Sequence, residues 1–453
     1  MRVRNKIVSA ILGVMLIFSS LGMCASATET GETPDTEVSS VDNSTEDLVD
    51  WPQGPSINSE AGIVMDIDSG AILYARNIDE QHYPASITKI MTALVALENY
   101  ELDETVKFTW DDIRFLEYGD AHIGIKPDEE LTMEDCLYGM LLASANEVSH
   151  GIGAHMEGGY EAFIEEMNET AKKLGCKNSH WMNTHGLHDD EHYTSARDMA
   201  LIGAAAFQHE DFRKITGTYQ HVIPETNITA EKRYVHQNHK MLRDWDSRYY
   251  EYCVGGKTGY TDQALSTLVT FATKEDVNLV AVVLKTHGGG NNTYADTRAM
   301  LDFAFDNFAK VPVTKDMIGE ENIAKLAKDS YVMLPTGVST DDLEMNFVAP
   351  TELKDRTGTV SFTYNGLEVG TVDVTITEDY YNEIHGIEDV VETKDKKKIE
   401  IKIPFILKLI LIIIGVVTAL FVGLVLYVAY KRKQIEERRR QRRMEYRRQR
   451  ELE

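Results

Sequence analysis

The feature that most constrains this chain is an uncharged apolar run near its C-terminus. Leu409–Tyr430 has no charged side chain and is rich in Leu, Ile and Val. A helix rises about 1.5 Å per residue, so a run of this length crosses a hydrocarbon layer about 30 Å thick. We therefore predict a transmembrane helix over residues 405–430. Residues 431–453 follow as a basic tail, and positive charge beside a span is typical of the cytoplasmic side.

The N-terminal end has the pattern of a secretory signal peptide. Three basic residues within the first six precede an apolar run that ends near Met23, and Ala25-Ser26-Ala27 provides small residues for cleavage. An uncleaved anchor helix is the alternative, although the run is near the lower length limit for spanning. We predict a signal peptide over residues 1–27. The body of the chain then lies outside the membrane, and the C-terminal tail lies in the cytoplasm.

The composition of the exported part argues against nucleic-acid binding and against a set of structural disulfides. The whole chain has a formal net charge of −27 although both of its ends are basic, so the part between them is strongly acidic. Such a surface does not bind nucleic acid through phosphate contacts. Beyond the signal peptide there are three cysteines, an odd and sparse set that does not indicate a disulfide framework. We expect them to be buried as small apolar side chains.

The rest of the chain divides by composition and periodicity. Residues 28–55 are rich in Thr, Glu, Ser and Asp, which predicts a disordered linker. Residues 56–310 contain alternating strand and helix patterns and form the predicted main domain. After it, short alternating segments and the hairpin signal Asn365-Gly366 predict a small β-rich domain over residues 312–385. Residues 386–403 are a polar, lysine-rich spacer.

The main domain contains helix and strand patterns at definite places. Strands are expected on both sides of the turn Asp68-Ser69-Gly70 and around residues 268–271 and 279–284. Helices are expected over residues 87–98, 132–142, 147–156, 160–173, 195–208 and 294–308.

Three short motifs in the main domain carry residue types used in acyl transfer. They are Ser86-Ile87-Thr88-Lys89, Ser144-Ala145-Asn146 and Lys257-Thr258-Gly259. A chain of this length is expected to hold about one or two chance matches to each of the first two patterns. Each motif alone is therefore weak, and their order and context make the set specific.

The first motif places a hydroxyl beside a base. A serine is a poor nucleophile until a base takes its proton, and residues three apart on a helix lie on the same face. Lys89 can act as that base if desolvation and a nearby cation, supplied by Lys257, lower its pKa. A helix start at Ser86 also aims backbone N–H groups at a developing oxyanion. The alternative is a surface serine and lysine on an amphipathic helix.

The other two motifs suit substrate positioning. Ser144 and Asn146 fall between two helical stretches, where Ser144 can relay a proton and Asn146 can bond a substrate amide; helix capping is the alternative. The Lys257-Thr258-Gly259 strand, with no side chain at Gly259, lets a peptide backbone approach as an added strand. A strand-edge turn is the alternative there.

A histidine cluster raises the question of a metal site. His185, His188 and His192 lie among acidic residues, but the signature His-Glu-x-x-His is absent and Gly186 breaks the run. The sequence also lacks a phosphate-binding glycine loop and a dinucleotide fingerprint. We therefore expect no metal and no cofactor.

The chain resembles the D-alanyl-D-alanine carboxypeptidases, low-molecular-mass penicillin-binding proteins related to class A β-lactamases. The resemblance runs from about Ala61 to Phe308. It is carried by Pro84–Thr92, His185-Gly186-Leu187, His192–Asp198 and Gly256–Thr261.

The resemblance implies an α+β fold in which a helical lobe packs on an antiparallel sheet, and the predicted small all-β domain is similar to the C-terminal domain that such enzymes carry. The C-terminal transmembrane helix is predicted from the apolar run alone and departs from the family's usual anchor, an amphipathic helix that lies on the membrane. The resemblance also implies Ser86 as the acylated nucleophile, Lys89 as base, and Ser144 and Asn146 as further catalytic groups. The implied substrate-binding residues are Lys257, Thr258, Gly259 and Tyr260, with the N–H groups of Ser86 and Tyr260 as oxyanion hole.

The sequence departs from the family pattern at three places. Glu147 stands where the family usually has Asp, and Leu265 stands where a glycine commonly follows Ala264. Thr293 occupies the place of an expected arginine, with Arg298 nearby. The residue that binds the substrate carboxylate is therefore open.

The implied function is a penicillin-sensitive serine carboxypeptidase that removes the terminal D-Ala from peptidoglycan pentapeptides and so limits cross-linking. Its expected partners are peptidoglycan stem peptides, β-lactams and the cytoplasmic membrane, with the catalytic domain facing the wall. One alternative is a β-lactamase-like hydrolase. Another is a catalytically weak wall-binding or septal partner protein, and the oligomeric state stays open.

Overall fold

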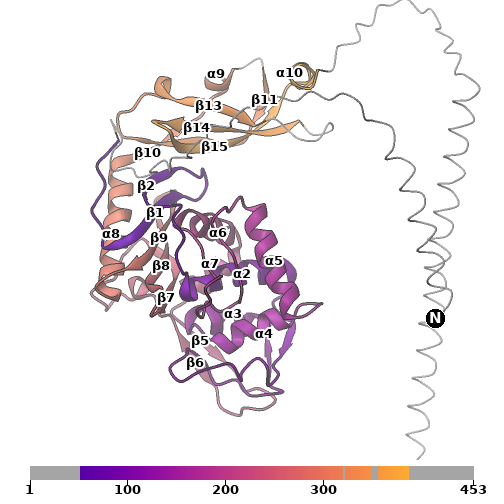
Figure 1. Cartoon of the computed structure of the whole chain (residues 1–453). Helices are drawn as coiled ribbons and strands as arrows, with labels where there is room; N and C mark the ends of the chain where they lie inside the picture. Colours follow the sequence, from indigo (N-terminus) through magenta and orange to yellow (C-terminus); the bar gives the residue numbers. More distant parts are fainter. Residues whose placement is uncertain (1–50, 320–321, 349–355, 387–453) are drawn as a thin grey trace, which may run out of the picture. The chain divides into compact units, whose positions relative to one another are not determined.

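A computed structural model describes residues 51–319, 322–348 and 356–386 of the chain (Figure 1). The predicted signal peptide, almost all of the linker, the spacer beyond residue 386, the span over 405–430 and the basic tail lie outside the described residues. Among the residues that are described, no helix has the length and apolar character needed to cross a membrane.

A five-stranded antiparallel sheet forms the centre of the main domain, in the order β2-β1-β9-β8-β7. Its strands are β1 (Ser59–Asp66), β2 (Ile72–Arg76), β7 (Cys253–Thr261), β8 (Leu265–Lys274) and β9 (Val277–Thr286). Side chains alternate between its faces because strands have a two-residue period. On β9, Val280, Val282 and Leu284 face one apolar core, whereas Leu279, Ala281 and Val283 face another.

Helices cover both faces of this sheet (Figure 1). On one face, α8 (Gly290–Asn307) packs through Met300, Leu301 and Ala304. On the other face lies a helical lobe that contributes to the larger core. The lobe consists of α2 (Lys89–Asn99), α3 (Met133–Leu142), α4 (Asn146–Ala154), α5 (Tyr160–Lys173), α6 (Ala196–Gln208) and α7 (Glu210–Gly217).

Two small sheets and two 3-10 helices complete the main domain. The small sheets pair β3 (Thr105–Lys107) with β4 (Glu130–Thr132) and β5 (Gln220–Ile223) with β6 (Arg233–His236). The 3-10 helices are η2 (Ala85–Thr88) and η3 (Lys240–Leu242). The sequence patterns did not predict α7, which is only eight residues long, or these short strands.

The remaining described residues are mostly β-structure. β10 (Phe308–Pro312) pairs with β12 (Tyr331–Pro335), and a four-stranded antiparallel sheet has the order β11-β15-β14-β13. Its strands are β11 (Ile323–Leu326), β13 (Glu344–Val348), β14 (Thr357–Tyr364) and β15 (Leu367–Ile376). The predicted turn between β14 and β15 is confirmed, since Asn365 and Gly366 both have positive φ, at 51° and 79°.

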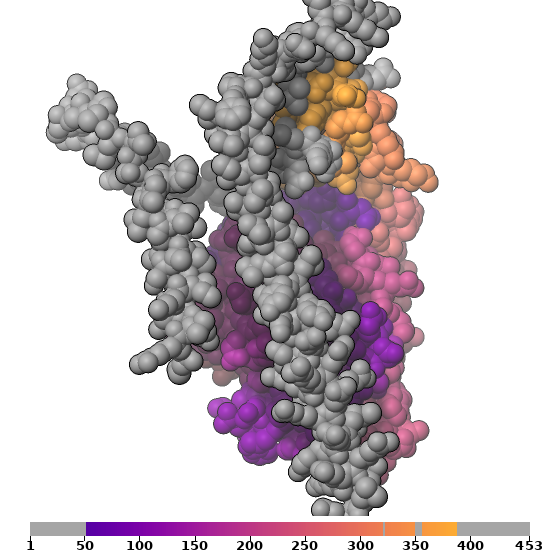
Figure 2. Space-filling model, turned by 90° about the vertical axis from the view of Figure 1, so that its right-hand side faces the viewer, coloured from indigo at the N-terminus to yellow at the C-terminus, as the bar shows by residue number. Residues whose placement is uncertain are grey.

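The description of this C-terminal part as all-β needs correction. It also contains α9 (Lys315–Ile318), α10 (Glu378–Ile384) and the 3-10 helix η4 (Thr340–Asp342). Helix α10 forms because the Thr377 side chain accepts a hydrogen bond from the Tyr380 N–H at the helix start. In the space-filling view the β-rich part and the helical lobe lie at opposite ends of the described residues (Figure 2).

Candidate active site

Ser86 lies on a tight turn that is held from two sides. It is the second residue of η2, which runs directly into α2. The preceding residue, Ala85, has a positive φ of 52°, a conformation that costs energy for any residue but glycine. On one side, Thr267 of β8 donates from Oγ1 to the Pro84 carbonyl at 2.8 Å. On the other, Gly186 approaches so closely that a Cβ there would lie 1.9 Å from the Ala85 carbonyl oxygen.

Gly259 gives the strand its close approach to the nucleophile. A Cβ at position 259 would lie 2.3 Å from Thr267 Oγ1 and 3.0 Å from the Ser86 nitrogen. Only glycine leaves room for β7 to pass beside the turn that carries Ser86. The third motif is therefore in contact with the first.

Lys89 is completely buried and its amine has three polar neighbours. Nζ lies 3.1 Å from Ser86 Oγ, 2.8 Å from Asn146 Oδ1 and 2.5 Å from the His185 carbonyl oxygen. The two carbonyl-type oxygens can only accept hydrogen bonds. As an ammonium group, Lys89 donates to all three oxygens. In the neutral form its two N–H donors bond the two carbonyl-type oxygens, and its lone pair is then directed to the Ser86 hydroxyl.

Lys257 joins the sheet to the second motif. Its buried Nζ donates to Ser144 Oγ at 3.0 Å and to the Thr258 carbonyl at 2.8 Å. Ser144 has a positive φ of 64° between α3 and α4. Helix α4 has no side-chain cap at its start. Neither Ser144 nor Asn146 therefore serves as the helix cap that the sequence left open as an alternative.

The two buried lysines have lowered pKa values. Burial is the main cause for Lys89, whose pKa falls well below its usual value, and the charge of Lys257 lowers it further. Glu147 and Asp120 act in the opposite direction on the pKa of Lys89. Burial alone lowers the pKa of Lys257 to about 7. We predicted that Lys257 lowers the pKa of Lys89, and the charge of Lys257 acts in that direction. Desolvation is the larger cause of the lowered pKa.

Glu147 is a further buried group beside the second motif. Its Oε1 accepts hydrogen bonds from the backbone N–H groups of Ile123 at 2.7 Å and Gly124 at 3.2 Å. Burial raises the pKa of this carboxyl. The longer side chain therefore ties α4 to the loop before β4, and the sequence comparison with the family was the only signal that singled it out.

The remaining predicted site residues lie along β7, the last strand in the order of the central sheet. Thr258 and Gly259 are half-buried, and the Tyr260 side chain is 62% exposed. A terminal strand presents backbone donors and acceptors to an incoming peptide. The Tyr260 hydroxyl donates to Asp262 Oδ1 at 3.2 Å.

Two of the departures from the family pattern have structural consequences. Leu265, at the start of β8, has a positive φ of 54°, which favours the glycine that is common there. Thr293 is buried in α8, and its hydroxyl has no hydrogen-bond partner among the described residues. Arg298 donates to the Tyr249 carbonyl and lies over the Tyr250 ring, with 4.8 Å from its Cζ to the ring centre.

The histidines that raised the question of a metal site have other partners. His192 lies 2.9 Å from Thr88 Oγ1 through Nε2, and its Nδ1 accepts from the Met182 N–H at 3.0 Å. His185 accepts from the Leu187 N–H through Nδ1 at 3.1 Å. These bonds shape the loop whose His185 carbonyl contacts Lys89. Sequence patterns missed that carbonyl because a backbone oxygen leaves no mark on residue type.

Solved structures of known proteins have a similar fold. The structure of the Streptomyces K15 DD-transpeptidase is similar with a TM-score of 0.52 at 24% identity, covering 56% of this chain and 99% of that one. The D-alanyl-D-alanine carboxypeptidase structure from Mycobacterium tuberculosis H37Rv gives 0.50 at 30% identity, covering 57% and 94%. The fold is thus of the penicillin-binding, transpeptidase-like α+β class with antiparallel sheets.

Sequence similarity then gives the family. Residues 49–288 match peptidase family S11, described as D-alanyl-D-alanine carboxypeptidase. The D-alanyl-D-alanine carboxypeptidase DacF of Bacillus subtilis is 31% identical over 331 residues, which cover 69% of this chain and 80% of that protein. The chain belongs to the D-alanyl-D-alanine carboxypeptidase family.

Proposed function

We propose that this chain is a serine-type D-Ala-D-Ala carboxypeptidase that removes the terminal D-Ala from peptidoglycan pentapeptides through an acyl-enzyme on Ser86. The observation that carries the proposal is the environment of Lys89. Its buried amine has two obligate acceptors, on Asn146 and His185, so the lone pair of the neutral form is directed to the Ser86 hydroxyl. A base with a lowered pKa beside a serine is the arrangement that activates a nucleophile.

In the acylation step, Lys89 takes the Ser86 proton while Oγ attacks the carbonyl carbon of the penultimate D-Ala. The carbonyl oxygen becomes an oxyanion, which the backbone N–H groups of Ser86 and Tyr260 stabilise. The substrate peptide lies along β7 as an added strand beside Gly259. The Thr258 hydroxyl is the proposed contact for the terminal carboxylate.

Collapse of the tetrahedral intermediate requires a proton on the leaving amine. The contact between Lys257 Nζ and Ser144 Oγ supplies a route, in which the Ser144 hydroxyl donates to the leaving nitrogen and is reprotonated from Lys257. A pKa of about 7 makes Lys257 able both to give and to accept a proton near neutral pH. The proton that Lys89 took from Ser86 then passes through Ser144 to the neutral Lys257, which leaves Lys89 neutral again. Lys89 takes a proton from the water that attacks the acyl-enzyme and returns it to Ser86 Oγ as the tetrapeptide leaves.

The sequence outside the described residues gives the cellular setting of this proposal. A signal peptide over 1–27 and a span over 405–430 would hold a catalytic domain over 56–310 on the wall side of the membrane. The linker over 28–55, the small domain over 312–385 and the spacer over 386–403 complete the proposed organisation. The basic tail over 431–453 would contact anionic lipid on the cytoplasmic side.

Two measurements on purified protein test the function. D-Ala release from a pentapeptide ending in D-Ala-D-Ala is measured with the wild-type chain and with Ser86→Ala, and both are labelled with a fluorescent penicillin. Wild type is expected to release D-Ala and to be labelled, whereas Ser86→Ala does neither. Labelling that persists in Ser86→Ala would refute the nucleophile. Penicillin hydrolysis faster than D-Ala release would favour the β-lactamase alternative.

A further inference from the structure

Three side chains of residue types that bind metals lie close together, apart from the contacts of Ser86. Glu60 lies on β1, and Glu80 and His82 lie in the segment between β2 and η2. One ligand atom from each of the three lies within 4.8 Å of the other two. Over the described ranges, no other group of at least three His, Cys, Asp or Glu side chains has this arrangement.

His82 is the unusual member of this cluster. The residue is only 6% exposed, and its Nε2 has no hydrogen-bond partner among the described residues. The closest acidic oxygen, Glu80 Oε2, is 3.7 Å away. An unsatisfied buried polar atom is destabilising, so its presence in a folded protein calls for a ligand or an explanation.

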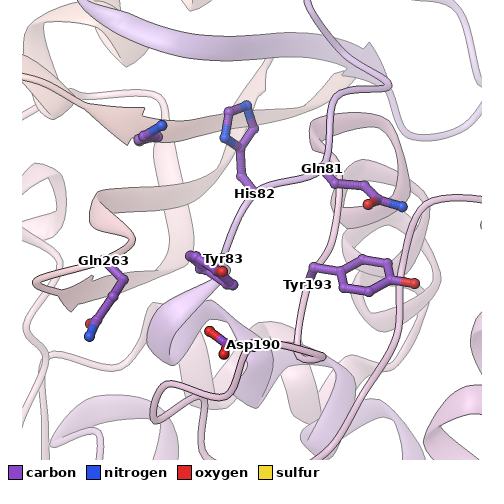
Figure 3. Close-up of a pocket in the computed structure, with 7 residues that line it drawn as sticks. Gln81, His82, Tyr83, Asp190, Tyr193 and Gln263 are labelled. Atoms are coloured by element: carbon purple, nitrogen blue, oxygen red, sulfur yellow. The ribbon is translucent and has the colours of Figure 1, made fainter.

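Two backbone hydrogen bonds fix the main chain at His82. His82 donates its N–H to the Thr194 carbonyl at 2.8 Å, and the Thr194 N–H donates to the His82 carbonyl at 2.9 Å. This isolated bridge joins the segment before Ser86 to the start of α6. In Figure 3 the His82 ring points away from Tyr83 and Asp190. The bridge therefore fixes the main chain from which the imidazole projects.

We propose that Glu60, Glu80 and His82 form a binding site for a divalent transition metal, with Zn²⁺ as the preferred ion. Two carboxylates and an imidazole are ligands that suit zinc. Tetrahedral ligands at about 2.0–2.2 Å from zinc are roughly 3.3 Å apart, close to the 3.7 Å between His82 Nε2 and Glu80 Oε2. His287 also pairs with Glu60, with 2.7 Å between its Nε2 and Glu60 Oε1, but it is not one of the three converging side chains.

Lys285 competes with the metal for this site. Its Nζ lies 2.9 Å from Glu60 Oε2, so an ammonium group pairs with one of the proposed ligands. The Lys285 side chain is 39% exposed and lines a cavity of about 230 Å³ together with His82, Tyr83 and Gln263 (Figure 3). Zinc binding displaces the ammonium from Glu60 into this cavity.

The site is close to the nucleophile in sequence. His82 is four residues before Ser86, and the same cavity is lined by Tyr83 and by Gln263 of the β7–β8 hairpin. A bound metal would tie β1 to the segment that leads into the Ser86 turn. The metal takes no part in the proposed acyl transfer, so this inference stands apart from the proposed function.

The test is zinc binding to the full-length, metal-stripped chain, measured by titration calorimetry and by the shift in unfolding temperature. We expect one zinc per chain. Glu80→Gln and His82→Gln each weaken binding by at least about tenfold, and Lys285→Ala binds zinc more tightly because the competing cation is gone. The Glu80 side chain is exposed, so Glu80→Gln should fold normally. It therefore tests the site even if the buried His82→Gln variant fails to fold.

A matched control is His155→Gln, which alters another histidine that pairs with a glutamate, Glu104, at 3.2 Å. Its zinc affinity should equal that of wild type. The proposal is overturned if the wild-type chain takes up no stoichiometric zinc, or if Glu80→Gln binds it as tightly as wild type. Equal weakening by His155→Gln would also overturn it, since binding would then be a general effect of surface histidines.

Discussion

Lys257 Nζ donates to Ser144 Oγ at 3.0 Å, and this bond joins the edge strand β7 to the turn between α3 and α4. The two residues are 113 positions apart in the sequence. The bond brings a second buried cation into the neighbourhood of Lys89, whose pKa it lowers. The electrostatics of the proposed base therefore depend on how the sheet meets the helical lobe.

Lys257→Met is expected to move the pH dependence of acylation. Lys89 is active when neutral, so the rate rises with pH through the folded-state pKa of Lys89. Burial and the Lys257 charge both lower that pKa, and removing the charge raises it. The rising limb should shift to higher pH, with a rate at neutral pH at least about tenfold lower. Stopped-flow acylation by a chromogenic β-lactam measures this, and an unshifted limb would contradict it.

Asn146→Asp is expected to raise the pKa of Lys89 by placing a negative charge beside its amine. The substitution puts a carboxylate where Asn146 Oδ1 now lies, 2.8 Å from Lys89 Nζ. An adjacent negative charge raises the pKa of Lys89 and keeps it protonated. Acylation at neutral pH should fall by about 100-fold and recover partly at alkaline pH. Asn146→Ala is the control, since it removes the bond without adding charge and should show no alkaline recovery.

Gly186→Ala is expected to disturb the nucleophile turn. The new Cβ would meet the Ala85 carbonyl oxygen at 1.9 Å, and residue 186 has a φ of +83°. Backbone atoms cannot yield as a flexible side chain does, so the turn carrying Ser86 shifts. We expect acylation to slow at least about tenfold and stability to fall by about 2–3 kcal/mol.

Gly175→Ala is the matched control for that variant. Gly175 has nearly the same φ, +82°, but a Cβ there meets no atom within 4 Å. It should cost about 1 kcal/mol of stability from the backbone conformation alone and leave the acylation rate unchanged. Equal acylation rates for the two alanine variants would mean that the contact with Ala85 has no role in positioning Ser86.

Leu265→Gly is expected to relieve backbone strain in the β7–β8 hairpin. Leu265 has a φ of +54°, which glycine adopts at no steric cost. Leu265→Ala removes the same side chain but keeps a Cβ, so the comparison isolates the conformational contribution. The glycine variant should be more stable than the alanine variant by about 1 kcal/mol. Thermal unfolding of the two variants checks this, and an alanine variant at least as stable as the glycine variant would contradict it.

Much of the main domain follows from local patterns. The apolar period on Ile90, Leu94 and Leu97 predicted a helix after Ser86, and α2 runs over Lys89–Asn99. The strands expected around residues 268–271 and 279–284 are confirmed as β8 and β9. Boundaries differ where no apolar residue marks them. Helix α8 begins at Gly290 rather than Tyr294, and its first two residues, Gly290 and Asn291, are exposed, so the apolar pattern did not indicate this start.

The sequence by itself determined which groups of the candidate site share one local element. Ser86 and Lys89 are three residues apart at the start of a helix, so helical geometry alone brings hydroxyl and amine together. The same local reasoning gave the hairpin at Asn365-Gly366, because a turn with two positive φ values favours these residue types.

Only the tertiary structure decided what surrounds these groups. Lys89 meets Asn146 and the His185 carbonyl across 57 and 96 positions of sequence, and Gly186 closes on Ala85. The burial that lowers the pKa of both lysines arises when the helical lobe packs on the sheet. Residue spacing encodes neighbours along one element, whereas desolvation and long-range contacts depend on how separate elements pack.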